Sequence, residues 1–210
     1  MKRARTSAQR QERRAMILAS ARTVFQSNQY EQITLDDIAR VAGLGKATLY
    51  SYFATREELF LALCQELLEA WFAQAHQQLG NLSTPATAAQ VATAITAMLP
   101  YHLDLMRLFP LVHSPIEPKV SPEVWLAYKE WFVPQIMQIG ALFETRLPFI
   151  PPGEGHRTTR YMYMLMLGMT QLPNGGRDQG SSQTRMPAIW LEDFHAAFSA
   201  LLLGMERRNQ

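Results

Sequence analysis

Four polar side chains that can contact a polyanion lie close together in one short segment. Lys46, Thr48, Tyr50 and Tyr52 all fall within the sequence GKATLYSYF. A lysine can donate hydrogen bonds to O6 and N7 of guanine, and threonine and tyrosine hydroxyls can donate to phosphate oxygens. One cation and several hydroxyl groups on one or two helical turns therefore indicate a surface that contacts nucleic acid.

Two short helices joined by a glycine-containing turn must position these side chains. The sequence TLDD, which begins at Thr34, is typical of a capping box, so a helix should start after it. Gly43 stands where a left-handed residue would end that helix, and a second short helix is predicted over residues 46–53. Leu49 and Phe53 are four residues apart and would face the core. The pair forms a helix-turn-helix, whose second helix enters the major groove.

Three further residues extend the predicted contact surface. Ala47 offers a methyl group to thymine. The helix N-terminus that Thr34 caps can itself bind an anion, and Arg56 opens the following helix, where it can clamp a phosphate. The alternative is a solvated helical hairpin with two half-buried tyrosines, because short helix pairs are common.

The sequence QITLDDIARVAGLGKATLYSYFATREELF resembles the DNA-binding domain of the tetracycline-repressor (TetR) family. The resemblance covers about residues 9–60 and rests on Phe25, Tyr30, Thr34, Ile38-Ala39, Ala42-Gly43, Thr48-Leu49-Tyr50, Tyr52-Phe53 and Arg56-Glu57-Glu58-Leu59. It implies an all-helical homodimer with three DNA-binding helices at the N-terminus and an inducer-binding helical domain after them. It places at DNA-contacting positions Thr34, Lys46, Ala47, Thr48, Tyr50, Tyr52 and Arg56.

Two residues depart from the family pattern. Many members carry lysine at the position of Arg56, which is a tolerable change for a phosphate contact. Asp36 lies early in the first of the two short helices, where phosphate would repel its carboxylate unless it accepts from a cytosine amino group. Asp36 is therefore left out of the predicted contact residues.

Charge is distributed unevenly along the 210 residues, whose net charge is +2. Residues 1–56 carry ten Lys or Arg and four Asp or Glu, which gives +6, and the remainder therefore carries −4. A basic end on a mildly acidic body indicates contact with a polyanion. For residues 2–14 a solvated basic tail is the alternative.

The remaining composition predicts a cytoplasmic protein that does not contact a membrane. Cys64 is the only cysteine, which excludes an intramolecular disulfide and suits a reducing compartment. No apolar segment follows the basic N-terminus as in a secretory signal. A helix that spans a bilayer needs about 18 or more consecutive apolar residues, and no such run occurs.

Helical periodicity is nearly continuous, and no convincing strand pattern interrupts it, so the predicted fold class is all-α. Proline and glycine clusters divide the chain into about nine helices. Their predicted ranges are about 9–27, 35–42, 46–53, 55–79, 84–100, 101–112, 121–147, 156–172 and 188–205, with a flexible loop over residues 173–187. The predicted domains are 1–56, in which 1–8 form a disordered basic arm, and 57–210, which serves regulation and dimerisation.

Within the predicted helix over residues 156–172, the segment 160–169 (RYMYMLMLGM) is apolar nearly all round, so it must be covered on both sides. One side meets its own core, and we expect the other to meet a second subunit; an internal core helix is the alternative. Such a homodimer would hold two recognition helices about 34 Å apart over successive major grooves of a palindromic double-stranded DNA operator. The predicted dimer interface comprises Tyr161, Leu165, Gly168, Trp190, Phe194, Phe198 and Leu201.

Methionine and aromatic residues are frequent in the middle of the chain, where they can line a cavity. Methionine side chains adapt to varied apolar ligands, and a few polar groups fix orientation. A hydrophobic or aromatic small-molecule inducer is therefore predicted, although ordinary core is the alternative for any single residue. The predicted pocket residues are Met98, Tyr101, His102, Met106, Phe109, His113, Trp125, Tyr128, Trp131, Met137, Met162 and Met166.

No pattern of residues predicts catalysis. The five histidines lack metal-ligand spacing, and one cysteine cannot build a zinc site, so no metal or cofactor is expected. No phosphate loop or nucleophile elbow occurs. The predicted function is a ligand-released repressor rather than an enzyme. A dimeric small-molecule-binding protein with a residual DNA domain, and a ligand-independent or activating regulator, are the alternatives.

Overall fold

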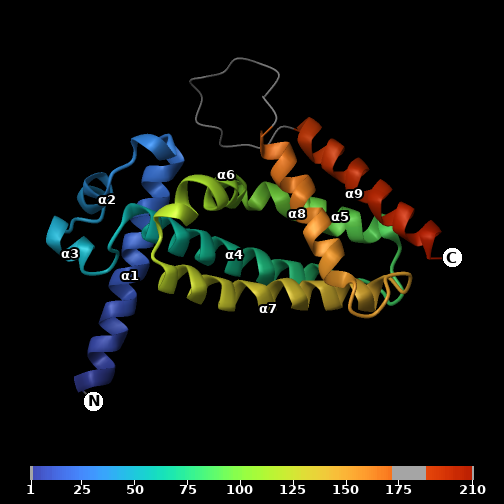
Figure 1. Ribbon diagram of the computed structural model, residues 1–210, viewed down its shortest axis with the longest axis horizontal. Helices are drawn as coiled ribbons and strands as arrows, with labels where there is room; N and C mark the ends of the chain where they lie inside the picture. Colours follow the sequence, from blue (N-terminus) through green and yellow to red (C-terminus); the bar gives the residue numbers. More distant parts are fainter. Residues whose placement is uncertain (1, 172–187, 210) are drawn as a thin grey trace. The chain divides into compact units, whose positions relative to one another are not determined.

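The computed structural model of the protein describes residues 2–171 and 188–209. Within these ranges there are nine α-helices and no strand, which confirms the all-α prediction. Figure 1 shows the helices, which are α1 (Lys2–Ser27), α2 (Leu35–Val41), α3 (Lys46–Tyr50), α4 (Arg56–Gly80), α5 (Ala88–Met98), α6 (Leu103–Leu111), α7 (Pro122–Arg146), α8 (Gly155–Gln171) and α9 (Ala188–Arg208). The predicted loop over residues 173–187 lies outside the described residues.

The chain divides into two compact units. The first unit runs to Glu66 and includes Leu111–Trp125, and the second contains Leu67–Pro110 and the chain from Leu126. The predicted boundary after residue 56 is therefore too early. The first turns of α4 belong to the first unit, where Glu57 Oε1 lies 3.7 Å from Lys119 Nζ of the returning segment.

Buried aromatic and aliphatic side chains hold the helices of the first unit together. The Phe60 ring meets Phe25 at 5.6 Å and Tyr30 at 5.1 Å between centroids. Ile38 and Leu49 are fully buried, so both short helices turn an apolar side inward. Because Leu49 is buried, the opposite side of α3 faces solvent.

Local signals in the first unit act largely as predicted. Asp37 N donates to Thr34 Oγ1 at 3.2 Å, and Thr34 N donates to Asp37 Oδ2 at 3.0 Å, which completes the capping box at the start of α2. Gly43 has a φ of 63°, the left-handed conformation that glycine adopts without strain. The Ser51 hydroxyl donates to Thr48 O at 2.7 Å, and α3 ends at Tyr50, before the predicted residue 53.

The first helix starts earlier than predicted. α1 begins at Lys2, so residues 2–8 belong to the helix rather than to the predicted disordered arm. The physical reason is that no glycine or proline occurs within Lys2–Ser27, so nothing interrupts propagation of the helix. The positive charges of this segment are therefore carried on a helix.

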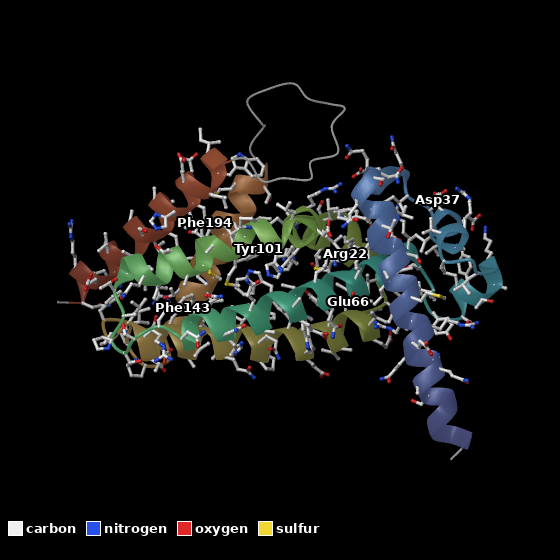
Figure 2. The ribbon with its side chains drawn as sticks, turned by 180° about the vertical axis from the view of Figure 1, so that it is seen from behind. Arg22, Asp37, Glu66, Tyr101, Phe143 and Phe194 are labelled. Atoms are coloured by element: carbon white, nitrogen blue, oxygen red, sulfur yellow. The ribbon has the colours of Figure 1, made fainter. Side chains whose placement is uncertain are left out.

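The second unit has a core in which α9 packs beside α5 and α8. Phe143, Phe194 and Phe198 are fully buried, with Phe198 in contact with both of the other rings. Figure 2 labels Phe143 on α7 and Phe194 on α9. Arg146, at the end of α7, donates to Leu79 O at 2.8 Å and Gly80 O at 2.7 Å. These bonds give side-chain donors to two carbonyl groups in the last turn of α4, of which Leu79 O also accepts from Leu82 N at 3.3 Å.

The fifth helix starts at a different cap from the one predicted. Ala88 is its first residue, and Thr87 forms a capping box with Gln90, whereas the sequence suggested a start at Thr84-Pro85. Reciprocal bonds to two backbone N–H groups make Thr87 the more effective cap.

Among all the helices that the structure describes, none has the length and apolar character needed to cross a bilayer.

Two glycines allow α7 and α8 to cross in backbone contact. A Cβ atom at Gly140 would lie 2.6 Å from His156 N, and a Cβ atom at Gly155 would collide with the carbonyl of Gly140. Glu144 Oε1 also accepts from Gly155 N at 2.7 Å. The first turn of α8 is therefore held against α7 by backbone contact and by a carboxylate cap.

We expect Gly140→Ala to lower the free energy of unfolding by about 1–3 kcal/mol, because the new methyl group meets backbone that cannot rotate away. Urea denaturation followed by circular dichroism measures this change. Gly80→Ala is the matched control, since nothing lies within 4 Å of its Cβ position. The control should change stability by less than about 1 kcal/mol. Equal stability of both variants would contradict the close crossing.

Candidate nucleic-acid interface and apolar pocket

The exposed side of α3 presents a cation that is already held in place. The Lys46 side chain is 61% exposed, and its Nζ donates to Asp36 Oδ2 at 2.8 Å. The same Nζ lies 6.0 Å from the centroid of the Tyr50 ring, which is also exposed. The hydrogen bond and charge of Asp36 raise the pKa of Lys46 above its usual value, so Lys46 is a cation with an oriented ammonium group.

Three more of the predicted contact residues lie at or near this surface. Ala47 is exposed, Thr48 is half-buried, and Thr34 is exposed at the N-terminus of α2. The Thr34 hydroxyl is already used, because it donates to Asp37 Oδ2 at 2.6 Å and accepts from Asp37 N. The hydrogen bonds that the Asp37 carboxylate accepts from the Thr34 hydroxyl, the Thr34 backbone N–H and Arg40 lower the pKa of the Asp37 carboxyl. Thr34 thus fixes the start of α2, and a phosphate there would have to share its hydroxyl.

Helix α1 adds two cations that the sequence interpretation did not assign to the interface. The Arg10 guanidinium lies 5.8 Å from the centroid of the half-buried Tyr52 ring, and that of Arg14 lies 5.4 Å from Phe53. Arginine over an aromatic face is a favourable arrangement. The sequence feature that could have identified these two arginines is their separation of four residues, which puts Arg10 and Arg14 on one face of a helix.

Arg56 has a different role from the predicted one. Its Nη1 donates to Ile33 O at 2.9 Å and to Tyr30 O at 3.1 Å, and its Nη2 donates to Glu57 Oε1 at 2.9 Å. Its guanidinium also lies over the Tyr30 ring, 4.4 Å from the centroid. The phosphate clamp predicted for Arg56 is not supported, because these donors are directed into the protein. Arg56 instead joins the start of α4 to the segment between α1 and α2.

The environment of Tyr30 confirms that this junction is buried. Tyr30 is only 3% exposed. Burial, followed by the negative charge of Glu57, raises the pKa of Tyr30 to about 12. The neutral phenol is therefore the form that this contact favours.

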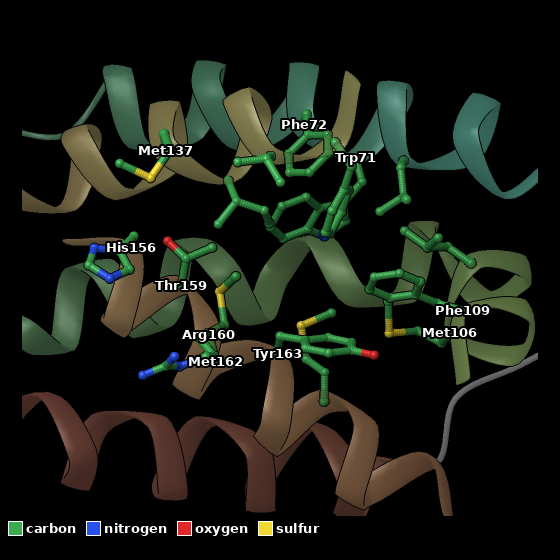
Figure 3. Close-up of a pocket in the computed structure, with 16 residues that line it drawn as sticks. Trp71, Phe72, Met106, Phe109, Met137, His156, Thr159, Arg160, Met162 and Tyr163 are labelled. Atoms are coloured by element: carbon green, nitrogen blue, oxygen red, sulfur yellow. The ribbon is translucent and has the colours of Figure 1, made fainter. Parts of the chain in front are cut away.

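A pocket with a volume of about 320 Å³ opens in the second unit between α4, α6, α7 and α8 (Figure 3). Its size is at the lower end of the range for sites that enclose small organic ligands. The residues that were predicted and do line it are Met106, Phe109, Met137, Met162 and Met166. The sequence interpretation missed others, including Trp71, Phe72, Phe132, His156, Thr159 and Arg160.

The other predicted pocket residues lie elsewhere. Tyr101 is 76% exposed, and the ring of His102 contacts Gln74 Oε1 at 2.6 Å through Nε2. His113 and Trp125 belong to the first unit. The remaining three do not line the pocket: Met98, Tyr128 and Trp131. Aromatic and methionine content alone does not distinguish a cavity wall from ordinary core. The part of the pocket wall that α4 contributes could have been recognised in the sequence, because Leu68, Trp71 and Phe72 have the spacing of one helix face.

Comparison with known proteins identifies the family. The family described as "Bacterial regulatory proteins, tetR family" matches residues 17–63, and "Tetracyclin repressor-like, C-terminal domain" matches residues 65–176. The chain belongs to the TetR family. It is therefore a DNA-binding transcriptional regulator.

Similar proteins agree with this assignment. The regulator EthR of Mycolicibacterium smegmatis is 35% identical over 58 residues, which are 28% of this chain and 27% of that protein. The activator FasR of the same organism is 41% identical over 56 residues, 27% of this chain and 26% of that protein. The chain thus spans about a quarter of the length of the curated relatives it matches. SCO4454, a TetR-family regulator from Streptomyces coelicolor, has a TM-score of 0.58 at 21% identity, covering 93% of this chain and 97% of that chain, which shows the fold alone.

The residues predicted to form a dimer interface fall into two groups. Phe194 and Phe198 are fully buried within the single TetR-family chain, so their assignment to an intersubunit face is wrong. The others remain at least partly accessible: Tyr161, Leu165, Gly168, Trp190 and Leu201. The same two helices also expose Met164, Ile189 and Leu203, which the prediction did not include.

We expect Arg56→Lys to lower the free energy of unfolding by about 1–3 kcal/mol, because one ammonium group cannot reach two carbonyls and a carboxylate in the same geometry. Denaturant titration measures this change. Arg40→Lys is the control, since Arg40 is exposed and pairs only with Asp37 among the described residues; it should change stability by less than about 0.5 kcal/mol. Unchanged stability of Arg56→Lys would restore the phosphate-clamp role.

Proposed function

We propose that this TetR-family DNA-binding regulator is a repressor that binds a palindromic operator as a homodimer and is released by a hydrophobic or aromatic small molecule. The single observation that carries the proposal is the course of α4. This helix provides Arg56 to the junction with the segment between α1 and α2, and it also provides Trp71 and Phe72 to the pocket wall. A change in the pocket that moves α4 therefore has a covalent route to the DNA-binding unit.

The exposed face of α3 supports the DNA half of the proposal. Lys46 and Ala47 at its start can approach base edges, with Lys46 donating to guanine and Ala47 contacting thymine. Tyr50 follows one turn later and can hold a phosphate. In a homodimer, two such helices about 34 Å apart match consecutive major grooves.

The pocket supports the ligand half. A ligand shifts the regulator toward release only as far as it binds one conformation more tightly than the other. α6 and α7 contribute Phe109 and Met137 to the same pocket, so a bound molecule contacts three helices together. The proposed response is a displacement of α4 that changes the separation of the two recognition helices and lowers affinity for the operator.

A regulator that activates transcription is the second candidate, because FasR, which is 41% identical over 56 residues, is described as an activator. Reporter expression from the target promoter separates repression from activation.

A dimeric small-molecule-binding protein with a residual DNA domain is the third candidate. Gel shift with DNA from upstream of the gene tests it, and lipophilic or aromatic compounds added to the complex test release. Retention of the complex with every compound would contradict the inducer role.

We expect Lys46→Ala to lower operator affinity about tenfold or more and to relax base preference at the position that Lys46 reads. Tyr50→Phe should lower the affinity for every DNA sequence by the same factor, because a phosphate contact carries no base information. Fluorescence anisotropy with operator DNA and single-base variants measures both effects. The same loss on every DNA for both variants would reject this division of roles.

The exposed apolar side chains of α8 and α9 are the proposed dimer interface. We expect Leu203→Glu to shift the protein from dimer to monomer, because an unpaired carboxylate would be buried between subunits. Sedimentation equilibrium measures the change, and operator affinity should fall with it. Leu126→Glu is the matched control, since Leu126 is equally an exposed leucine but lies on α7. A dimer that survives Leu203→Glu but dissociates with Leu126→Glu would place the interface on α7.

A further inference from the structure

The pocket of the second unit offers hydrogen-bond donors and a cation but no carboxylate. None of its lining residues is aspartate or glutamate, whereas Arg160 is one of them. Most of the remaining wall is methionine, leucine and aromatic side chain. A cationic ligand would therefore lose its hydration without gaining a counter-charge, which is costly in an apolar site.

Trp71 provides a donor that has no acceptor in the described parts of the chain. Its side chain is only 4% exposed, and Nε1 makes no hydrogen bond there. An indole N–H can only donate, and a buried donor without an acceptor destabilises the protein. Figure 3 shows the Trp71 ring at the pocket with its nitrogen turned toward the space between the helices. An acceptor atom on a ligand would satisfy this group.

Arg160 provides the positive charge. Its side chain is exposed, and the structure records neither a hydrogen bond nor an ion pair between its guanidinium and any described residue. Arg157, on the same helix, differs because it pairs with Glu154 Oε2 at 2.7 Å. Arg160 therefore keeps a planar set of donors that can bind a carboxylate through two parallel hydrogen bonds.

Three polar lining residues, one of them charged, lie at one end of the pocket, while the Tyr163 ring lies 4.8 Å from the Phe109 ring at the other end. Figure 3 shows His156, Thr159 and Arg160 together, with Met106 and Phe109 at the other end. The His156 Nδ1 lies 2.7 Å from Gly153 O, which orients the ring. This asymmetry matches a molecule with an acidic group at one end and an apolar body.

We propose that the ligand of this pocket is an organic acid, whose carboxylate pairs with Arg160, whose apolar or aromatic body contacts the methionine and phenylalanine wall, and whose body carries an acceptor for Trp71 Nε1. The inference rests on the proposed function, since it names the chemical class of the small molecule that the pocket takes. It predicts that lipophilic cations bind more weakly than acids of the same shape, because the lining offers no carboxylate.

Matched compounds test the acidic group directly. Calorimetry measures binding of para-benzoylbenzoate, para-benzoylbenzamide and para-benzoylbenzylamine, and a second series compares decanoate, decanamide and decylamine. We expect the carboxylate to bind about tenfold more tightly than the amide, and the amine most weakly. In Arg160→Gln the preference for carboxylate over amide should disappear. Arg207→Gln, an exposed arginine on α9 outside the pocket, should retain it.

The Trp71 donor is tested with the ketone oxygen of the probe. Para-benzoylbenzoate should bind about fivefold more tightly than para-benzylbenzoate, which lacks that oxygen. Trp71→Phe keeps an aromatic ring but removes the N–H, so this difference should vanish. Trp125→Phe, outside the pocket, should preserve it.

The outcomes separate the inference from the proposed function. Amides or amines that bind as tightly as the acids, or an acid preference that survives Arg160→Gln, would overturn the inference and leave the inducer role standing. Acids that bind through Arg160 but never release operator DNA would uphold the inference and overturn the inducer role. If none of the compounds binds the wild-type protein, both fail.

Discussion

The guanidinium of Arg56 holds the first turn of α4 to the chain between α1 and α2. It donates to two backbone carbonyls, pairs with Glu57 and lies over the Tyr30 ring. Backbone carbonyl groups need hydrogen-bond donors when they leave water. Arg56 supplies donors to Tyr30 O and Ile33 O, so it ties the segment that precedes α2 to the start of α4 within the first unit.

The second unit depends on a comparable constraint at the crossing of α7 and α8. Gly140 and Gly155 allow the two backbones to touch, and Glu144 caps the first turn of α8. The residues that follow within the next turns of α8 form the polar end of the pocket. Backbone contact is harder to deform than side-chain contact, because no rotamer change can relieve it. The position of the pocket's charged end is therefore set by two residues that have no side chain.

Much of the fold was predictable because its signals are local. Proline, glycine and capping residues marked nearly all of the helix boundaries, and the Thr34 capping box and the left-handed Gly43 occur where the sequence predicted them. The start of α1 was missed, because a basic composition suggested a solvated arm although no helix breaker was present. The start of α5 was missed because two threonines, Thr84 and Thr87, stood in competing cap positions.

The sequence by itself determined the helical class, the helix-turn-helix and the exposed residues at the start of α3, because each depends on contacts within a few residues. Only the tertiary structure decided what long-range contacts control. It directed Arg56 into the protein, buried Phe194 and Phe198 in the subunit's own core, and brought Trp71 and Arg160 to one pocket. The physical reason is that periodicity identifies which face of a helix is apolar, whereas packing decides what covers that face.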